Sequence, residues 1–516
     1  MTFIGVTAAI ATEQEPRAFS DLPEAIQRQI GQGPPRDSMQ IEASPFGTHT
    51  TIMGEGGSAE YIHQAPDLIA KAGYKWVMDY ISIRSTEGMT VEDVANKFSH
   101  LPQRCFDFAQ ALKDRDIGLM VRLDPFPWTP WKEGTHPVFA EQSETLDKAK
   151  VFTREVVRQL KPYTRYWQIW NEPNIGNENP YILPADYVQV VRELAKVIRE
   201  EQPDAVIMGP GTAMLQCLAD TPYPWIPVAL DAGLLDTIDV FTFHPYRQPA
   251  VQENIPEHAS EFHPWTIWGG YEEQIADLRT RLRKHTSDGE DFPIASTEDG
   301  SHNTINGEGE QEITWVIGAK YELRRSLLDF YLNVSPRIQF CFYRPIGEKY
   351  YNKQSTFNLL TDDMQPKPTY YAVQNLHALL DSSYERDDTV DVELDFSGAA
   401  KPTGNCVIQT YYTDRGDFEE LLIFFWSAEP SDDRHARYPA TLTLTDMGWE
   451  GPMLFDLMAM PVKRPKNEII EHARSDYVDR AGPRELVPEV SEDRLILSGI
   501  EVRDYPQAIK LIRLVE

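Results

Sequence analysis

The middle of the chain alternates between short apolar segments and amphipathic helical segments at a regular spacing. Apolar residues that recur every three to four positions predict a helix, and short apolar runs bounded by turn residues predict a strand. Eight strands are predicted, at residues 47–51, 75–83, 117–125, 166–174, 205–212, 239–247, 293–303 and 337–345. A helix is predicted after each strand, at residues 65–72, 105–113, 144–160, 185–200, 225–234, 271–285, 311–330 and 368–380.

Most of the predicted strands are continuous apolar runs and do not alternate with polar residues. Continuous runs are typical of parallel strands that are buried on both faces of a sheet. Eight strands, each followed by a helix, fit a (β/α)₈ barrel with some loop insertions. We therefore predict an α/β fold, with a TIM barrel over residues 46–384.

The pattern changes at residue 385, where short alternating or β-branched runs are separated by Gly, Pro and Asp-rich turns. These runs lie at residues 389–396, 406–413, 420–428, 440–446, 453–460, 494–502 and 508–515. They predict an all-β sandwich domain over residues 385–516. The segment 1–45 contains one helical pattern, "DLPEAIQRQI", and is expected to pack on either the barrel or the sandwich.

The charge of the chain restricts its partners. The 516 residues include 49 Lys+Arg and 80 Asp+Glu, which gives a formal net charge of −31. Nucleic acids and anionic membranes are themselves negative, so neither is expected as a partner. No apolar run has the length of a membrane span. A chain of this length is expected to form two domains.

Cysteine usage and the N-terminus say little about the compartment. Cys105, Cys217, Cys341 and Cys406 are widely spaced, so neither a disulfide framework nor a cysteine metal site is expected. The opening "FIGVTAAIA" is short and no Lys or Arg precedes it, which makes a poor signal peptide. The localisation is therefore open: cytoplasmic if Met1 is the natural start, and secreted or periplasmic if a signal peptide was removed.

Two glutamates stand at the ends of apolar strands. Glu172 ends the fourth predicted strand and Glu298 ends the seventh. Glu is depleted from strands, and reactive groups of a (β/α)₈ barrel lie at the C-terminal strand ends. Two carboxyl groups that face each other are what glycosidic bond cleavage requires, because one must donate a proton while the other is ionised. The pair therefore indicates a glycoside hydrolase.

The motifs around these glutamates resemble a known group. The segments "WQIWNEPN" and "IASTEDG" are similar to the signature pair of clan A glycoside hydrolases. The layout of barrel and sandwich most resembles family 39, with families 5 and 30 as neighbours. The resemblance implies that Glu172 is the acid/base, Glu298 the nucleophile and Asn171 the partner of the substrate 2-hydroxyl. The segment "FTFHPYR" resembles the clan's His-x-Tyr pattern, which implies that His244 lines the site and Tyr246 steadies the nucleophile.

Three further residues are predicted to bind substrate. His49 closes the first strand and is placed to line the pocket. Trp170 precedes the Asn-Glu-Pro motif, where an aromatic ring can stack on sugar. Tyr343 lies in the eighth strand, which commonly ends in Trp in the clan but here reads Phe-Tyr-Arg.

The second strand differs from the resembled pattern as well. In the clan this strand often supplies an arginine to the site, whereas here it offers Met78 and Asp79. Arg84 or Arg122 is expected to replace that arginine. Asp299, which follows Glu298 where an aromatic is usual, is interpreted as a supporting acid and not as a catalyst.

We therefore expect a retaining glycoside hydrolase that cleaves O-glycosidic bonds by double displacement through a glycosyl-enzyme, acting on an oligosaccharide or glycoside. Exo action is favoured, because the aromatic and His-rich stretch 245–271 suits a lid over a closed pocket. The alternatives are an endo-acting glycanase and a barrel that binds carbohydrate without catalysis. This chemistry requires neither a metal nor an organic cofactor. The sugar and the oligomeric state remain open.

Overall fold

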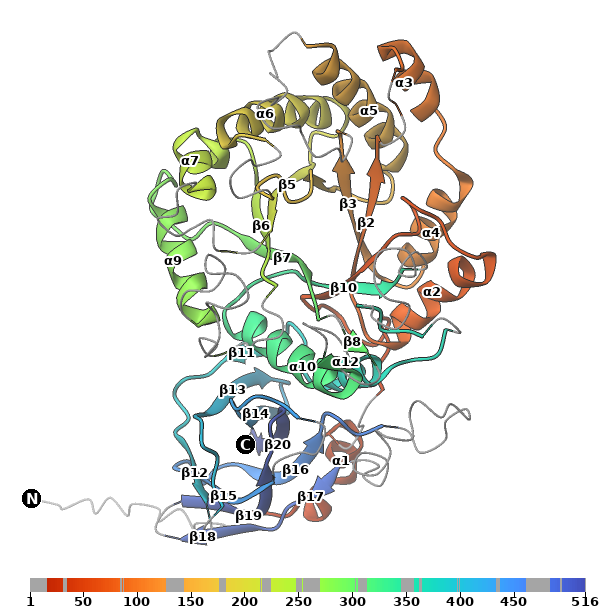
Figure 1. Cartoon of the computed structure of the whole chain (residues 1–516). Helices are drawn as coiled ribbons and strands as arrows, with labels where there is room; N and C mark the ends of the chain where they lie inside the picture. The colour runs from red at the N-terminus through yellow and green to blue at the C-terminus, as the bar shows by residue number, and fades with distance from the viewer. Residues whose placement is uncertain are drawn as a thin grey trace, which may run out of the picture.

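The computed structural model contains a barrel and a β-sandwich (Figure 1). It describes residues 16–30, 35–83, 86, 88–126, 143–175, 182–213, 215, 224–246, 253, 270–301, 303–304, 313–344, 357–361, 364–396, 398, 400–432, 437–460, 483–491 and 494–515. No helix within these ranges is both long enough and apolar enough to cross a membrane. Cys105, Cys341 and Cys406 are free thiols, and Cys217 lies outside the described residues.

Eight parallel strands close a barrel, which confirms the predicted α/β fold. They are β1 (Phe46–Thr50), β2 (Trp76–Ser82), β3 (Gly118–Asp124), β4 (Tyr166–Ile169), β5 (Val206–Ala213), β6 (Val240–His244), β7 (Ile294–Asp299) and β10 (Arg337–Tyr343). Neighbouring strands pair in chain order, and β10 closes the ring against β1. The C-terminal ends of all eight strands therefore meet at one end of the barrel, which we call the mouth.

The predicted helices surround the barrel. They are α2 (Ala59–Lys71), α4 (Gln103–Lys113), α5 (Glu144–Leu160), α6 (Pro184–Glu201), α7 (Trp225–Asp231), α9 (Tyr271–Arg283), α10 (Trp315–Tyr331) and α12 (Pro368–Leu379). Within the barrel part of the chain, the described elements that the prediction did not include are α3 (Val91–Phe98), the short helix η3 (Leu234–Asp236), and the ladder formed by β8 (Asn303–Thr304) and β9 (Ile313–Thr314).

The barrel interior is filled by a layer of apolar side chains below the mouth. This layer consists of Met78, Met120, Met208, Ala295 and Ile338. Side chains alternate along a strand, so Arg122 and Asp124 lie in the same row of β3 as Met120 but closer to the mouth. The alternate row of β3, Leu119, Val121 and Leu123, belongs to the core that the barrel shares with its helices. Arg122 is thus placed at the mouth by the parity of its strand.

The C-terminal part of the chain forms two antiparallel sheets, as predicted. One sheet has the order β11 (Glu385–Arg386), β13 (Cys406–Asp414), β14 (Phe418–Ser427), β20 (Gln507–Leu514), β16 (Glu450–Asp456) and β17 (Arg484–Glu485). The other has the order β12 (Val392–Phe396), β15 (Tyr438–Leu444), β19 (Arg494–Val502) and β18 (Pro488–Ser491).

Strand β14 connects the two cores. Leu421, Ile423 and Phe425 pack in the core between the two sheets. The alternate residues Leu422, Phe424 and Trp426 belong to the core that includes the barrel and its helices. Figure 1 shows α10 and α12 between the barrel and this sheet. The continuous apolar run of β14 therefore reflects burial on both of its faces.

The N-terminal segment contacts both parts of the molecule. Its helices η1 (Phe19–Asp21) and α1 (Glu24–Ile30) lie against the sandwich, where Leu22 and Ile30 cluster with Phe418 and Ile512. Farther along, Ser38 donates a hydrogen bond to the Arg115 carbonyl of the barrel at 2.7 Å. The segment thus runs from the sandwich to the first barrel strand.

Candidate active site

Glu172 follows β4 on an unusual backbone. Trp170 and Glu172 have φ angles of +74° and +47°, in the left-handed region that non-glycine residues rarely adopt. The Glu172 amide donates to the Gly211 carbonyl at 2.8 Å, and Gly211, in β5, has a φ of +61°. Such a conformation persists only where the surroundings hold it, and it is frequent at functional sites. It turns the Glu172 side chain towards the mouth.

Glu298 lies near the end of β7 and is only 7% exposed. Arg122 Nη1 donates to its Oε1 at 2.5 Å, and the Tyr246 hydroxyl donates to its Oε2 at 3.2 Å. His49 Nε2 lies 3.7 Å from Oε1, and His244 Nδ1 lies 3.6 Å from Oε2. Side chains from β1, β3 and β6 and from the residues just after β6 therefore converge on one carboxylate.

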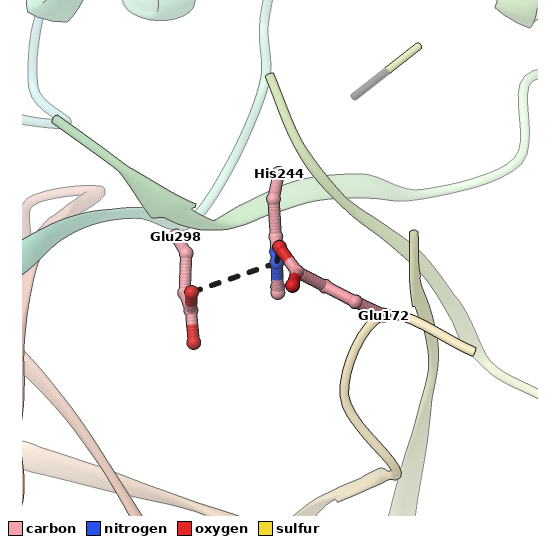
Figure 2. Close-up of side chains that lie close together, drawn as sticks. All are labelled: Glu172, His244 and Glu298. Carbon is pink, nitrogen blue, oxygen red and sulfur yellow. Dashed lines mark hydrogen bonds and ion pairs between the residues drawn. The ribbon is translucent and has the colours of Figure 1, made fainter. Parts of the chain in front are cut away.

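His244 lies between the two glutamates (Figure 2). Its Nδ1 is 2.9 Å from Glu172 Oε1. One oxygen of Glu172, one oxygen of Glu298 and one nitrogen of His244 all lie within 4.8 Å of one another. The structure thus brings together two residues that are far apart in the sequence, with their carboxylates facing the same space.

The surroundings of Glu298 favour its ionised form. Burial alone raises the pKa of this carboxyl, but the charges of His244 and Arg122 outweigh burial and lower its pKa to about 2. Glu172, His244 and Glu298 also have the spacing of a possible cation site among the described residues. The guanidinium of Arg122 already lies at Oε1 of Glu298, which disfavours a second cation there.

Arg122 of β3 is the arginine that contacts Glu298. Besides Glu298, its Nη1 donates to Asn171 Oδ1 at 2.6 Å, and its Nε donates to Asp124 Oδ1 at 2.9 Å. Its guanidinium also lies over the ring of Tyr80 at 4.9 Å. The buried Asp79 of β2 instead binds the Thr50 hydroxyl at 2.6 Å. Arg84, the other candidate, lies outside the described residues.

His49 is buried beside Glu298 without a hydrogen-bond partner for either ring nitrogen among the described residues. Burial lowers the pKa of His49 to about 3, so its imidazole is neutral near neutral pH. The ring of Phe340 packs edge-on against it, with ring centroids 5.1 Å apart. Buried polar atoms are nearly always paired, so an unpaired neutral imidazole at the mouth is suited to a polar ligand.

Trp170 and Tyr343, which are also predicted to bind substrate, each pack against an aromatic neighbour. Trp170 is buried and packs against Phe126, with ring centroids 4.4 Å apart. Tyr343 packs against Tyr61 at 4.7 Å. Phe340 of β10 is half-buried, contacts His49 and is absent from the predicted site residues. Its place two residues after the inward-facing Ile338 is the sequence signal that identifies it.

The described residues thus combine a (β/α)₈ barrel, a β-sandwich and two glutamates, one just after the fourth barrel strand and one near the end of the seventh. Comparison of the sequence with protein-family models and with curated proteins finds no match. Solved structures that match the fold include family 39 members and other glycoside hydrolases.

Three of these structures cover nearly the whole chain. A family 39 glycoside hydrolase from Bacteroides cellulosilyticus WH2 has a TM-score of 0.59 at 16% identity, over 92% of this chain and 81% of that one. The family 39 enzyme from Xanthomonas axonopodis pv. citri has a TM-score of 0.53 at 14% identity, over 94% and 96%. A monomeric beta-xylosidase from Caulobacter crescentus CB15 has a TM-score of 0.53 at 13% identity, over 94% and 98%. The chain therefore has the family 39 fold.

Proposed function

We propose that this protein is a retaining glycoside hydrolase, with Glu298 as the nucleophile and Glu172 as the acid/base. The observation that carries the proposal is the short separation of the two carboxylates, which have one oxygen each within 4.8 Å. Retaining enzymes hold their carboxyl groups about 5–5.5 Å apart, whereas inverting enzymes leave about 6.5–9.5 Å for a water molecule. The separation favours attack by a carboxylate over direct attack by water.

In the first step, an ionised oxygen of Glu298 bonds to the anomeric carbon as the glycosidic C–O bond breaks. Glu172, in its protonated form, transfers its proton to the departing oxygen, so that the leaving group is released as a neutral alcohol. Arg122 and Tyr246 hold the Glu298 carboxylate in position for attack. The product is a glycosyl-enzyme ester.

In the second step, the Glu172 carboxylate takes a proton from a water molecule, and the water oxygen bonds to the anomeric carbon. The ester bond breaks and returns Glu298 as a carboxylate, which restores the starting state with retained configuration. Asn171 accepts from Arg122 through Oδ1, so its amide Nδ2 points away from that guanidinium. We assign this amide to the substrate 2-hydroxyl and the imidazole of His49 to another hydroxyl of the same sugar.

We propose exo action, because one structural neighbour that covers 94% of this chain is a beta-xylosidase and another with the same coverage is a glucosidase. Of the stretch 245–271 that is predicted to form a lid, only residues 245–246, 253 and 270–271 are described. An exo enzyme hydrolyses 4-nitrophenyl β-D-xyloside or β-D-glucoside and releases single sugars from a xylan or glucan chain. An endo enzyme gives mixed oligosaccharides, and a binding protein without catalysis gives neither product.

The nucleophile and the acid/base are tested with Glu298→Ala and Glu172→Ala, each assayed with sodium azide. We expect Glu298→Ala to be inactive alone and to give a glycosyl azide of inverted configuration, because azide replaces the missing nucleophile in a single displacement. Glu172→Ala is the matched control. In this variant Glu298 still forms the glycosyl-enzyme, azide attacks it in place of water, and the product therefore retains the configuration of the substrate.

Full turnover by Glu298→Ala, or the same azide configuration from both variants, would contradict the assignment. The configuration of the azide product is read by NMR.

A further inference from the structure

A network of buried charges lies directly behind Glu298. Asp299, the next residue of β7, pairs with Arg325 of α10 at 3.0 Å and with Arg337 of β10 at 3.1 Å. Both arginines also approach Asp329, at 3.4 Å and 3.5 Å. All four side chains are nearly inaccessible to solvent. Asp299 therefore faces away from the sugar site, and two guanidinium groups fix its side chain.

Arg325 also reaches the other strand end that carries site residues. Its Nη2 donates to the Pro245 carbonyl at 2.5 Å. Pro245 lies between His244, which contacts Glu172, and Tyr246, which donates to Glu298. The Tyr246 amide donates to the His244 carbonyl at 3.0 Å, so the chain makes a tight turn at Pro245. The direction of the Pro245 carbonyl is coupled to the placement of both site residues.

We propose that Arg325 is a positioning residue that sets the Glu298 nucleophile and the His244–Tyr246 turn in register with each other. The inference rests on the function proposed above. One guanidinium joins the residue after the nucleophile on β7 to the turn that follows β6. Arg337 also binds Asp299, but the contacts of its guanidinium run to Glu322 and Asp329 and not to Pro245.

The geometry suits a guanidinium at this position. Arg325 Nε lies 3.0 Å from Asp299 Oδ2 as an ion pair, Nη2 donates a hydrogen bond to the Pro245 carbonyl, and the guanidinium carbon lies 3.6 Å from the ring centre of Tyr271. A planar fork with several fixed donors satisfies these directions at once, whereas a lysine ammonium is a single point charge on a flexible stem. Arg325→Lys therefore keeps the charge but loses the simultaneous contacts.

The test compares Arg325→Lys with Arg324→Lys. Arg324 is the adjacent residue of α10, is equally buried and also pairs with an acid, but its contacts are Glu253 and the sandwich residues Glu429 and Ser431. Active sites are titrated with the 2,4-dinitrophenyl 2-deoxy-2-fluoro-β-D-glycosides of xylose and glucose, and label on Glu298 is located by mass spectrometry. The kcat for 4-nitrophenyl glycosides is then expressed per titrated site.

We expect kcat per titrated site to fall about 10- to 100-fold in Arg325→Lys, because displacement of reacting groups by an ångström costs rates of that order. KM should change less than about threefold, and Arg324→Lys should keep the wild-type kcat per site. A purely structural role would instead lower the titrated fraction and the melting temperature in both variants, with kcat per site unchanged.

The outcomes separate the two proposals. If wild-type Glu298 takes no label and wild-type protein hydrolyses neither glycoside, the proposed function fails. If wild-type Glu298 is labelled and Arg325→Lys keeps the wild-type kcat per site, the positioning role fails while the function stands. The positioning role is also rejected if Arg325→Lys has no titratable sites while Arg324→Lys does, because Arg325 is then required for folding.

Discussion

The charge of Glu298 depends on a small set of neighbours. Burial favours the neutral acid, and the groups that oppose it most strongly are His244 and Arg122. Arg122 is the permanent cation among them. Burial lowers its pKa, but the carboxylates of Asp124 and Glu298 outweigh burial and raise that pKa above the ordinary value for arginine. Its guanidinium therefore stays charged near neutral pH and favours the ionised form of Glu298.

Replacement of Arg122 by Met should expose this dependence. An opposite charge within a few ångströms lowers a carboxyl pKa by about 1 to 3 units, so its loss should raise the pKa of Glu298 by that amount. The nucleophile then becomes protonated on mild acidification, and the acid limb of kcat/KM moves to higher pH. The kcat/KM at the optimum should also fall about 100-fold, because Asn171 loses its hydrogen-bond donor.

The measurement is a profile of kcat/KM for an aryl glycoside between pH 3 and 8. Arg122→Lys is the matched control, because it keeps the charge and loses the forked geometry. It should lower the rate while leaving the acid limb near its wild-type position. An acid limb that stays unchanged in Arg122→Met would show that Arg122 does not set the ionisation of Glu298.

Sequence reasoning identifies the glutamates more readily than the residues around them. Glu172 and Glu298 stand out because a charged residue at the end of an apolar strand needs a reason. Arg122 points to the mouth because it lies in the inward-facing row of alternate residues of β3. Since β3 is buried on both faces, its sequence does not show which row faces inward. Trp170 is an aromatic residue, which is why it is predicted to contact sugar. The direction of its ring depends on a backbone φ of +74°, and the ring packs against Phe126. A backbone turn of this kind has no local sequence signature.

At the scale of elements, periodicity was sufficient for most of the barrel and the sandwich. The missed helix α3 does carry a signal, because Thr90 and Asp93 form a capping box at its first turn. Strand order in the sandwich was not predictable, since β14 pairs with the distant β20 as well as with its neighbour β13. Such pairings depend on long-range packing, which local patterns do not contain.

Helix α12 is joined to the start of the barrel by a buried histidine. His377 Nδ1 lies 2.8 Å from the Ala72 carbonyl, and its ring stacks on Phe46 at 4.6 Å. Burial lowers the pKa of His377 from 6.5 to about 3. The unfolded chain therefore binds a proton at this residue between about pH 6.5 and 3, while the folded chain does not. Stability from His377 is complete above pH 6.5 and is lost on acidification.

His377→Phe should therefore change the pH dependence of unfolding. At pH 8 the variant should be less stable than wild type by about 1–3 kcal/mol, because the Ala72 carbonyl loses its partner. Between pH 8 and pH 5 this deficit should shrink by about 2 kcal/mol. At pH 5 the unfolded wild type gains a proton on His377 that its folded form does not bind, which destabilises the wild type but not the variant. Urea unfolding at both pH values measures the difference. A deficit independent of pH would contradict the low pKa.

At the scale of the whole molecule, α10 connects the sandwich to the candidate site. Its Lys320 pairs with Asp504 of the sandwich at 2.7 Å, and both side chains are buried. Its Arg325 contacts the residues behind Glu298. On the side of the sandwich that faces α10 (Figure 1), Leu422, Phe424 and Trp426 of β14 pack in the core that includes the barrel and its helices. One helix thus links the two parts, and we expect them to unfold in a single transition.

Asp504→Ala tests this connection, because it leaves the Lys320 ammonium buried without its carboxylate. Loss of one partner of a buried ion pair costs about 3–5 kcal/mol, so the unfolding free energy of the whole chain should fall by that amount. The double variant Lys320→Met with Asp504→Leu should recover most of the loss, since it removes both charges. Asp446→Ala is the control. It breaks the more exposed pair with Arg513, which is worth about 0–1 kcal/mol.

Because the chain has 11 tryptophans, unfolding should be followed by pulsed hydrogen exchange and mass spectrometry, with peptides of the barrel strands and of the sandwich strands reporting the two midpoints separately. Coincident midpoints that shift together in Asp504→Ala would show that the sandwich supports the barrel as part of one cooperative unit. A barrel midpoint that stays in place while the sandwich midpoint falls would show that the barrel is stable by itself. In that case α10 holds the site without the help of the sandwich, and kcat per active site should not respond to Asp504→Ala.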